Sequence, residues 1–343
     1  MRVLEVSRYK NNIADHQLPL VTEQGEAIRA QGCDVDYFLV RGNYIKAVKA
    51  LKAKIQEFKP DVVHAHFGLS AITAELQSLV PVVTTFHNGE THNWHVNLMS
   101  SLMSLRAKHV IYVAEHIHQI VYFKAKHYSI IPCGVTLEDC FLMDKAEARK
   151  KLGWDADKKY IMFGGAFSNE RKNYSLLREA VFRINDGMSR DKSLNEPLTL
   201  NDGGEQFGNI VCVEMKGLSR AECVLRMNAC DVFALPTKNE GSPQALKEAM
   251  AVNCPIVATD VADIKHLLGD LPGHYILPNK KGNHAFWEGD ESSAGELAEL
   301  LKQALAFEGQ TKGRERIIDL QLTNELVAKR IVEIYENVLK NKN

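Results

Sequence analysis

The sequence predicts an α/β protein of two domains, each built on an open, mainly parallel sheet flanked by helices. The first observation is the alternation of short β-branched runs with amphipathic helical patterns from the first residue onward, which is typical of parallel sheets. The second is a pause in this alternation at residues 131–155, where Pro, Gly and many charged residues separate two such series. The third is the length of 343 residues, which exceeds what one hydrophobic core usually organises.

Short apolar runs in the first half predict strands at residues 3–7, 35–40, 62–64, 82–86, 110–113 and 129–131. A helix is predicted between the second and third strands, because apolar residues recur there every three or four positions. These residues are Ile45, Val48, Leu51, Ile55 and Phe58. The other faces of this helix carry Lys46, Lys49, Lys52 and Lys54. They form either a solvated surface or a weak site for an anionic membrane.

The second half repeats the pattern, with strands predicted at residues 160–163, 210–213, 232–235 and 255–258. Ser219 and Glu222 have the spacing of a capping box and predict a helix that ends near Cys230. Residues 186–208, which are rich in Asp, Asn, Gly and Pro, predict a long loop around a short strand near Leu198. The chain ends with an amphipathic helix predicted at residues 323–340.

Composition excludes some classes of function. With 45% apolar and 25% charged residues the chain falls in the soluble globular range. A formal net charge of -1 gives no reason to expect nucleic-acid binding. Seven scattered cysteines without a CxxC pair indicate reduced thiols and a cytoplasmic protein. The N-terminus lacks the pattern of a signal peptide, and no uncharged apolar stretch reaches the ~18 residues of a membrane span.

One stretch carries most of the chemical signal: NEGSPQALKEAMAVNCPIVATD at residues 239–260. It follows a predicted strand and opens a helix, with Pro243 placed as the first helical residue. Ligands bind at the carboxyl ends of parallel strands, and a helix start favours an anion such as a diphosphate. On a helical wheel Glu248 lies beside the apolar stripe, so its carboxylate can reach a ligand without entering the core. Glu240, before the helix, would face the far end of the phosphates.

The two glutamates do not have the arrangement of a glycosidase pair. Retaining hydrolases hold their carboxyl groups about 5–5.5 Å apart across one bond. Glu240 and Glu248 are instead separated by a turn and part of a helix, in which each residue adds about 1.5 Å of rise. The spacing fits two separate contacts along an extended ligand. Two ordinary surface glutamates without a ligand would be equally compatible with this sequence.

The stretch resembles the signature of the retaining glycosyltransferases of family 4, which have the GT-B fold and use nucleotide sugars. DVVHAHFG, PVVTTFHNGE, VIYVAEHIHQIV, IPCGVTLEDCF and IMFGGAFSNERKNYSLL are similar to further parts of the family and occur in the same order. The resemblance implies two Rossmann-like domains with parallel sheets facing a central cleft. Residues 1–135 with the C-terminal helix at 323–343 would form the acceptor-side domain, and residues 136–322 the nucleotide-sugar-binding domain.

The resemblance also assigns roles to individual residues. Glu240 would contact hydroxyls of the donor sugar, Glu248 the ribose, and Lys172 the diphosphate. The backbone amides of the turn would lie over the phosphates or the sugar; this turn comprises Gly241, Ser242, Pro243 and Gln244. His87, at the end of a predicted strand, would reach the donor sugar. No metal or other cofactor is expected besides the donor, because the lysine supplies the cation that the leaving diphosphate needs.

The sequence departs from the family pattern in two places. Many members place an arginine directly after the glycine of the first strand of the nucleotide domain, but here Gly165 is followed by Ala166. We expect Arg171 to supply the second phosphate cation instead. Many members also have a Gly-Gly loop after the first strand, where this chain has RYKNN at residues 8–12, and the role of that loop is left open.

The expected reaction is transfer of a sugar from a nucleoside diphosphate sugar to a hydroxyl of a glycan or lipid-linked acceptor, for instance in the biosynthesis of a surface polysaccharide. Residues 1–135 contain 14 Lys or Arg and 11 Asp or Glu. This surplus permits peripheral contact with the inner face of an anionic membrane.

Three other hypotheses remain open at this point. His64 and His66 end a strand, as metal ligands do in amidohydrolase barrels, so a metal-dependent hydrolase is one alternative. It also needs later ligands, but His266, His274 and His284 follow no evident strand. The Asp-x-Asp spacings at residues 34–36 and 155–157 suggest a metal site of another glycosyltransferase fold, yet they lie in a strand and in the linker. A non-catalytic homologue that binds sugar nucleotide is the third.

Overall fold

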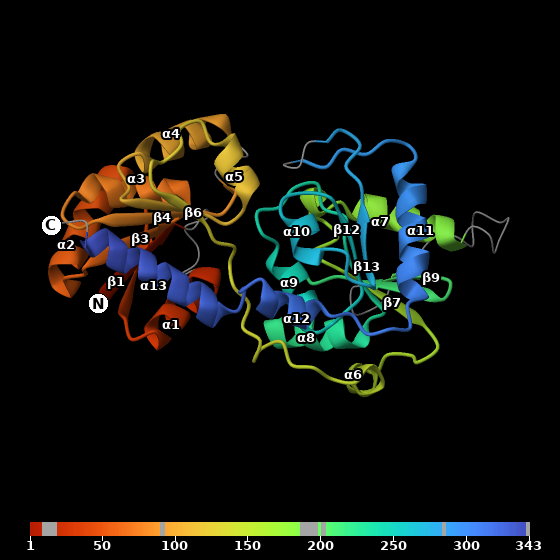
Figure 1. The fold of residues 1–343 in the computed structure, drawn as a ribbon. Helices are drawn as coiled ribbons and strands as arrows, with labels where there is room; N and C mark the ends of the chain where they lie inside the picture. Colours follow the sequence, from red (N-terminus) through yellow and green to blue (C-terminus); the bar gives the residue numbers. More distant parts are fainter. Residues whose placement is uncertain (9–18, 90–92, 186–197, 200–203, 283–285, 341–343) are drawn as a thin grey trace. The chain divides into compact units, whose positions relative to one another are not determined.

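The computed structural model describes residues 1–8, 19–89, 93–185, 198–199, 204–282 and 286–340. The chain divides into two compact units (Figure 1). Unit 1 consists of Met1–Gly134 and Gln321–Asn343, and unit 2 of Val135–Leu320. Both units are parallel-sheet α/β structures, and this confirms the predicted fold class.

Unit 1 contains a six-stranded sheet in the order β2-β1-β3-β4-β5-β6, with all pairs parallel. Its strands are β1 (Arg2–Arg8), β2 (Asp34–Val40), β3 (Val62–His66), β4 (Val82–Phe86), β5 (His109–Tyr112) and β6 (Tyr128–Ile130). The strand order reverses between β1 and β3, so the loops after these strands diverge at that point. Each strand lies within two residues of its predicted position.

Helices cover both faces of this sheet (Figure 1). They are α1 (Pro19–Ala30), α2 (Tyr44–Phe58), α3 (Gly68–Gln77), α4 (Trp94–Ser104), α5 (Glu115–Ile120) and α13 (Asn324–Lys340). One face packs against α1 and α13, through residues such as Ile28, Ile331 and Tyr335. The other packs against α2 and α3, through Leu51 and Ala71. The C-terminal helix therefore belongs to the core of unit 1.

Unit 2 contains a seven-stranded sheet in the order β13-β12-β11-β7-β10-β9-β8. Its strands are β7 (Lys159–Phe163), β8 (Leu198–Thr199), β9 (Glu205–Phe207), β10 (Ile210–Val213), β11 (Val232–Leu235), β12 (Ile256–Thr259) and β13 (His274–Leu277). The five strands from β13 to β10 are parallel, whereas β8 and β9 add an antiparallel edge. The strand order reverses between β7 and β11, which places the loops after these two strands at a switch point.

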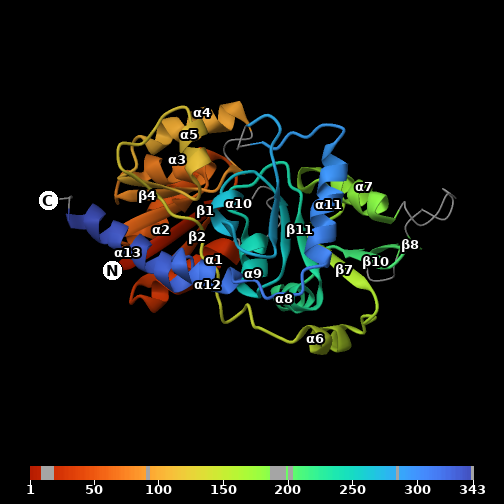
Figure 2. The same cartoon turned by 45° about the vertical axis from the view of Figure 1, so that its right-hand side comes forward.

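Helices alternate with the strands of this sheet along the chain (Figure 2). They are α6 (Lys145–Leu152), the 3₁₀ turn η2 (Glu170–Lys172), α7 (Tyr174–Asn185), α8 (Arg220–Ala229), α9 (Gln244–Ala251), α10 (Ile264–Leu268), α11 (Ser293–Leu305) and α12 (Gly313–Asp319). Helix α8 begins with the predicted capping box, in which Ser219 and Glu222 satisfy each other's backbone N–H groups. Within the described residues, no helix combines the length and the apolar character that a bilayer span requires.

Several sequence predictions need correction. Strand β13, which begins at His274, was not predicted, and β9 lies inside the segment predicted as a long loop around a short strand near Leu198. Pro243 is the N-cap of α9 and not its first helical residue, although its φ of -67° fits the prediction of a helix start. Asp34 and Asp36 lie on β2 and pair with Arg2 and Lys54, so their carboxylates serve ion pairs of unit 1.

Glu75 gives unit 1 a pH-dependent stability. It lies on α3 with 5% exposure, and its Oε1 has no hydrogen-bond partner in the described residues. Burial raises its pKa from 4.5 to about 8, although Arg106 and Lys108 oppose this shift. Because the folded pKa exceeds the unfolded one, Glu75 favours folding below its unfolded pKa and loses this contribution progressively up to the folded pKa.

We expect Glu75→Gln to raise the free energy of unfolding by about 2 kcal/mol at neutral pH, because the amide is never ionised. The gain should vanish below the unfolded pKa of Glu75. Thermal unfolding of wild type and variant across this pH range tests the effect. Equal pH slopes of the two proteins would show that Glu75 ionises freely in the folded state.

Candidate functional site

The predicted donor-site residues of unit 2 follow β7 and β11, the two strands at the switch point. Gly164 and Gly165 follow β7 directly, and the chain then reaches Lys172 at the end of η2. Glu240 lies on the connection from β11 to α9. Since both loops leave the carboxyl ends of neighbouring parallel strands, side chains 68 positions apart meet there.

Lys172 and Glu240 form a partly buried ion pair. Lys172 Nζ lies 2.7 Å from Glu240 Oε1, and their side chains are 15% and 9% exposed. Thr237 Oγ1 lies 3.1 Å from the same oxygen. A water-poor setting strengthens such a pair electrostatically. It also keeps an ammonium and a carboxylate ready for a ligand that carries both negative charge and hydroxyl groups.

The glycine before Ala166 allows the lysine to take this position. A Cβ added to Gly165 would lie 2.8 Å from Lys172 Cγ, and one added to Gly164 would lie 2.7 Å from a methyl group of Leu235. The two glycines therefore allow β7 to end against the lysine stem and against β11. Arg171 is exposed on η2 beside Lys172, and its role as the second phosphate cation stays a prediction.

The turn from Gly241 to Gln244 leads into α9, whose N-terminus carries partial positive charge. The Ser242 hydroxyl donates to Asp263 Oδ2 at 2.8 Å, and Lys247 Nζ donates to Ser242 Oγ at 3.3 Å. Burial raises the pKa of Asp263 to about 6, although Lys247 and Ser242 oppose this shift. Lys247 and Asp263, which sequence reasoning missed, thus hold the turn in place. Their signal is a lysine within the helix that follows β11 and an aspartate shortly after β12.

Glu248 differs from its expected setting. It is only 6% exposed, and it lies within a helix whose residues from Leu246 to Ala251 are all buried. Arg220 Nη2 lies 3.0 Å from Glu248 Oε1. The wheel predicted a carboxylate beside one apolar stripe, but α9 contacts both α8 and α12 as well as the sheet, so it is buried on more sides than one. Arg220, the first residue of α8, was missed as its partner.

His87 belongs to unit 1, where it directly follows β4 and is partly buried. It belongs to a chain of hydrogen bonds, and its Nδ1 lies 3.7 Å from Cys133 Sγ. Glu5 Oε2 is 2.6 Å from His66 Nε2, and His66 Nδ1 is 3.1 Å from His87 Nε2. A branch through His64 connects Glu5 with Tyr335 and Thr85. In the register of β1 and β3, Glu5 lies opposite His64, which brings it close to both histidines. The strand order of the unit 1 sheet reverses between these two strands.

The hydrogen bonds of Glu5 and His66 orient the ring of His87. Burial opposes ionisation of Glu5, but His64 and His66 outweigh it and hold the pKa of Glu5 at about 2. Burial and His64 lower the pKa of His66, although Glu5 opposes this shift. Because a carboxylate only accepts hydrogen bonds, His66 donates to Glu5 through Nε2 and turns its Nδ1 toward His87.

The histidine pair does not have the surroundings that the hydrolase hypothesis requires. His64 and His66 lie on an open six-stranded sheet and not in a barrel, and this contradicts the amidohydrolase-type fold. Ligand atoms of Glu5, His64 and His66 do lie within 4.8 Å of one another, as in a metal site. Each of these three side chains already has a hydrogen-bond partner within unit 1. His284 of the same hypothesis lies outside the described residues.

The loop at residues 8–12 lies outside the described residues except for Arg8. The Arg8 guanidinium lies 4.9 Å from the centre of the Tyr44 ring. Glu90, which follows His87 in the family-like stretch, also lies outside them.

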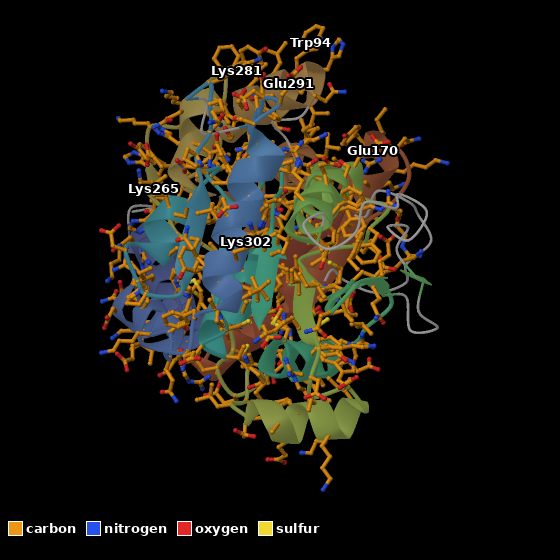
Figure 3. All side chains as sticks on the ribbon, turned by 90° about the vertical axis from the view of Figure 1, so that its right-hand side faces the viewer. Trp94, Glu170, Lys265, Lys281, Glu291 and Lys302 are labelled. Carbon is orange, nitrogen blue, oxygen red and sulfur yellow. The ribbon has the colours of Figure 1, made fainter. Side chains whose placement is uncertain are left out.

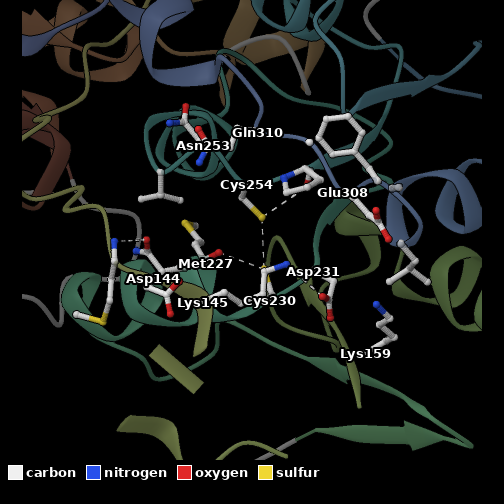
Figure 4. Close-up of a pocket in the computed structure, with 18 of the residues that line it drawn as sticks. Asp144, Lys145, Lys159, Met227, Cys230, Asp231, Asn253, Cys254, Glu308 and Gln310 are labelled. Carbon is white, nitrogen blue, oxygen red and sulfur yellow. Dashed lines mark hydrogen bonds and ion pairs between the residues drawn. The ribbon is translucent and has the colours of Figure 1, made fainter. Parts of the chain in front are cut away.

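A pocket of about 1040 Å³ lies in unit 2 at the end of the sheet opposite to Lys172 and Glu240 (Figure 4). Its lining includes Lys159, Asp231 and Pro255, which precede or begin β7, β11 and β12. These positions are the amino ends of the strands, whereas Lys172 and Glu240 follow the carboxyl ends. The pocket is therefore distinct from the candidate donor site.

Two family models match the chain: "Glycosyltransferase Family 4" at residues 35–139 and "Glycosyl transferases group 1" at residues 158–289. Together they match more than half of it. The chain belongs to the family 4 glycosyltransferases. The putative teichuronic acid biosynthesis glycosyltransferase TuaC of Bacillus subtilis is 26% identical to this glycosyltransferase over 242 residues. The match covers 66% of this chain and 59% of TuaC, so it spans less than two thirds of that relative.

Solved structures share the GT-B fold of this glycosyltransferase. Sucrose-phosphate synthase from Thermosynechococcus elongatus superimposes with a TM-score of 0.76 at 18% identity, over 99% of both chains. Anabaena HepE in complex with UDP, and with UDP and glucose, superimposes with a TM-score of 0.71 at 13% identity, over 98% of this chain and 100% of HepE. At these identities the likeness shows the fold alone.

Proposed function

We propose that this glycosyltransferase moves a sugar from a nucleoside diphosphate sugar to a hydroxyl of a glycan or lipid-linked acceptor, with retention of the anomeric configuration. The observation that carries the proposal is the 2.7 Å pair of Lys172 Nζ and Glu240 Oε1 at the carboxyl ends of neighbouring strands. It offers a cation for a diphosphate and a carboxylate for sugar hydroxyls, next to the N-terminus of α9.

In the proposed reaction, the bond between the anomeric carbon and the diphosphate oxygen breaks while the acceptor oxygen bonds to the same face of that carbon. The acceptor proton moves to the departing phosphate. Lys172 stabilises the negative charge that grows on the leaving diphosphate. Glu240 holds the sugar, and Glu248 holds the ribose after exchanging its bond with Arg220. His87, whose ring is oriented by His66 and Cys133, would contact the sugar. No protein nucleophile and no essential metal take part.

The relatives support the substrate class. HepE was solved with UDP and with glucose, and TuaC carries a description in teichuronic acid biosynthesis. We therefore propose a role in surface polysaccharide biosynthesis, in the cytoplasm and at the inner face of the membrane. All seven cysteines lie among the described residues, are buried and form no disulfide, which fits a reducing compartment.

A thermal-shift screen of UDP, GDP and ADP sugars tests the proposal, because a ligand that binds only the folded state raises its stability. We expect sugars of one base to raise the unfolding temperature; a ligand at a hundred times its Kd adds about 2.7 kcal/mol. The Lys172→Ala protein should lose most of the shift. If no nucleotide sugar shifts the folded protein, or if purified protein contains stoichiometric zinc that it needs for a hydrolase activity, the proposal is wrong.

A further inference from the structure

Helix α4 of unit 1 has its polar and apolar faces reversed. The helix is eleven residues long, and its buried side chains are all polar. They are Asn97, Ser100, Ser101 and Ser104. Their spacing of three or four residues defines one stripe that faces the unit. An ordinary surface helix buries its apolar stripe instead.

The outward face of α4 is apolar. Trp94 is 58% exposed, Met99 47% and Leu102 44%, and Leu105, just after the helix, is 49% exposed. Figure 3 shows Trp94 projecting from the surface. The helix contains no charged Lys, Arg, Asp or Glu residue, so nothing on this face except His95 competes with the apolar groups. A contiguous apolar face of this kind marks an interaction site.

The inward polar face is held by specific hydrogen bonds, so the reversal is part of the structure. Ser101 and Ser104 donate to the carbonyl groups of Asn97 and Ser101, both at 2.7 Å. The Asn97 amide donates to Ile120 O at 3.0 Å, at the end of α5. The Asn97 bond joins α4 to α5, which lies beside it (Figures 1 and 2), whereas the two serine bonds lie within α4. Turning the helix over would break the Asn97 bond.

Basic residues border the apolar face. Leu105 is followed by exposed Arg106 and Lys108. The segment after α5, which Asn97 holds against α4, repeats this order with two exposed aromatic residues and two exposed lysines. They are Tyr122, Phe123, Lys124 and Lys126. Residues 93–131 contain four Lys or Arg and a single acid, Glu115.

We propose that the α4 face, defined as Trp94, Met99, Leu102 and Leu105 with Tyr122 and Phe123, inserts into the interface of an anionic lipid bilayer. Trp and Tyr favour the headgroup level, and the bordering bases attract anionic lipids. A second copy of this chain fits less well, because it would bring like charges together. The inference rests on the proposed function in that a membrane surface is where a lipid-linked acceptor would lie.

Co-sedimentation with vesicles tests the proposal. The full chain should bind vesicles of phosphatidylcholine with phosphatidylglycerol more tightly than phosphatidylcholine alone. Met99→Gln combined with Leu102→Gln should weaken this binding at least about tenfold, because two apolar side chains no longer enter the interface. Trp94 provides a direct signal. Its fluorescence should shift to the blue on binding and be quenched by brominated lipid, and this change should be absent in Trp94→Phe.

Helix α2 offers a matched control. Ile45 is 85% exposed there, next to the lysines that the sequence offered as a membrane site. Ile45→Gln should leave vesicle binding unchanged. Lys124→Gln with Lys126→Gln should reduce the preference for anionic vesicles, whereas Lys46→Gln with Lys49→Gln should not. The α4 face is not the docking surface if the variants of this face and the α2 variants bind vesicles equally well. The same holds if the fluorescence of Trp94 does not change when vesicles are added.

Two further outcomes also count against it. A dimer that dissociates in the Met99→Gln, Leu102→Gln protein would show that a second copy covers this face. A protein that binds nucleotide sugars but no vesicles would contradict the membrane surface and retain the proposed function. The reverse result, vesicle binding without donor binding, would retain the α4 face and contradict the proposed function.

Discussion

Glu240→Ala is expected to lower the rate of sugar transfer by at least roughly 10²–10³-fold while leaving the affinity for nucleoside diphosphates nearly unchanged. The Glu240 side chain is 9% exposed and lies beside the ammonium of Lys172. Little water therefore reaches the carboxylate, and a bound sugar can contact it directly. A contact to the sugar that strengthens as the bond to phosphate breaks lowers kcat, whereas a contact to the nucleotide raises the dissociation constant.

Measuring kcat for the donor identified by thermal shift, and the affinity for the free nucleoside diphosphate, separates these two effects. Glu170→Ala is the matched control, because Glu170 is an exposed carboxylate on the same 3₁₀ turn as Lys172. It should transfer sugar at the wild-type rate. Full activity in Glu240→Ala would remove the central assignment. A large loss of nucleotide affinity with unchanged kcat would move Glu240 from the sugar to the nucleotide.

The sequence was sufficient for the fold because the central strands are buried on both sides. β3 and β4 are buried at every residue and have the sequences VVHAH and VVTTF, so they appear as short runs rich in β-branched residues that stand out from the helices. The missed strands lie toward the two sides of the unit 2 sheet: β13 is an edge strand, and β9 pairs with β10 and with the two-residue edge strand β8. β9 contains Glu205 and Gln206, and β13 begins with half-buried His274 and Tyr275. Edge strands have one solvated side and give a weaker apolar signal.

Candidate site residues could be named from the sequence, but their structural partners could not. Lys172 and Glu240 were found through motifs, and the 2.7 Å contact between them came only from the fold. Arg220 and Glu5 had no such motif. Glu5 is 61 positions from His66, and its single signal is a charge inside the apolar run of β1. Spacing along the chain predicts neighbours within a helix or turn, whereas these contacts depend on strand order and register.

Asp231→Ala is expected to destabilise unit 2 by about 3–5 kcal/mol, because it leaves a buried arginine without its counter-charge. Asp231 Oδ2 accepts from Arg149 Nη2 at 2.7 Å and from the backbone N–H of Tyr160 at 2.8 Å. Lys145 Nζ lies 3.2 Å from its other oxygen, beside the pocket of Figure 4. The side chains of Arg149 and Asp231 are 11% and 9% exposed.

Asp231 immediately precedes β11, the strand that leads to Glu240, so its loss should reduce the amount of folded enzyme without changing kcat per folded molecule. Denaturant unfolding gives the energy, and transfer activity normalised to the folded fraction tests the second point. Glu147→Ala is the control: its pair with Lys151 on α6 has side chains 56% and 50% exposed, and such pairs contribute about 0–1 kcal/mol. Asp231→Asn keeps an acceptor for the Tyr160 N–H and should cost less than alanine. Equal losses for Asp231→Ala and Glu147→Ala would mean that water reaches Arg149 and compensates its charge.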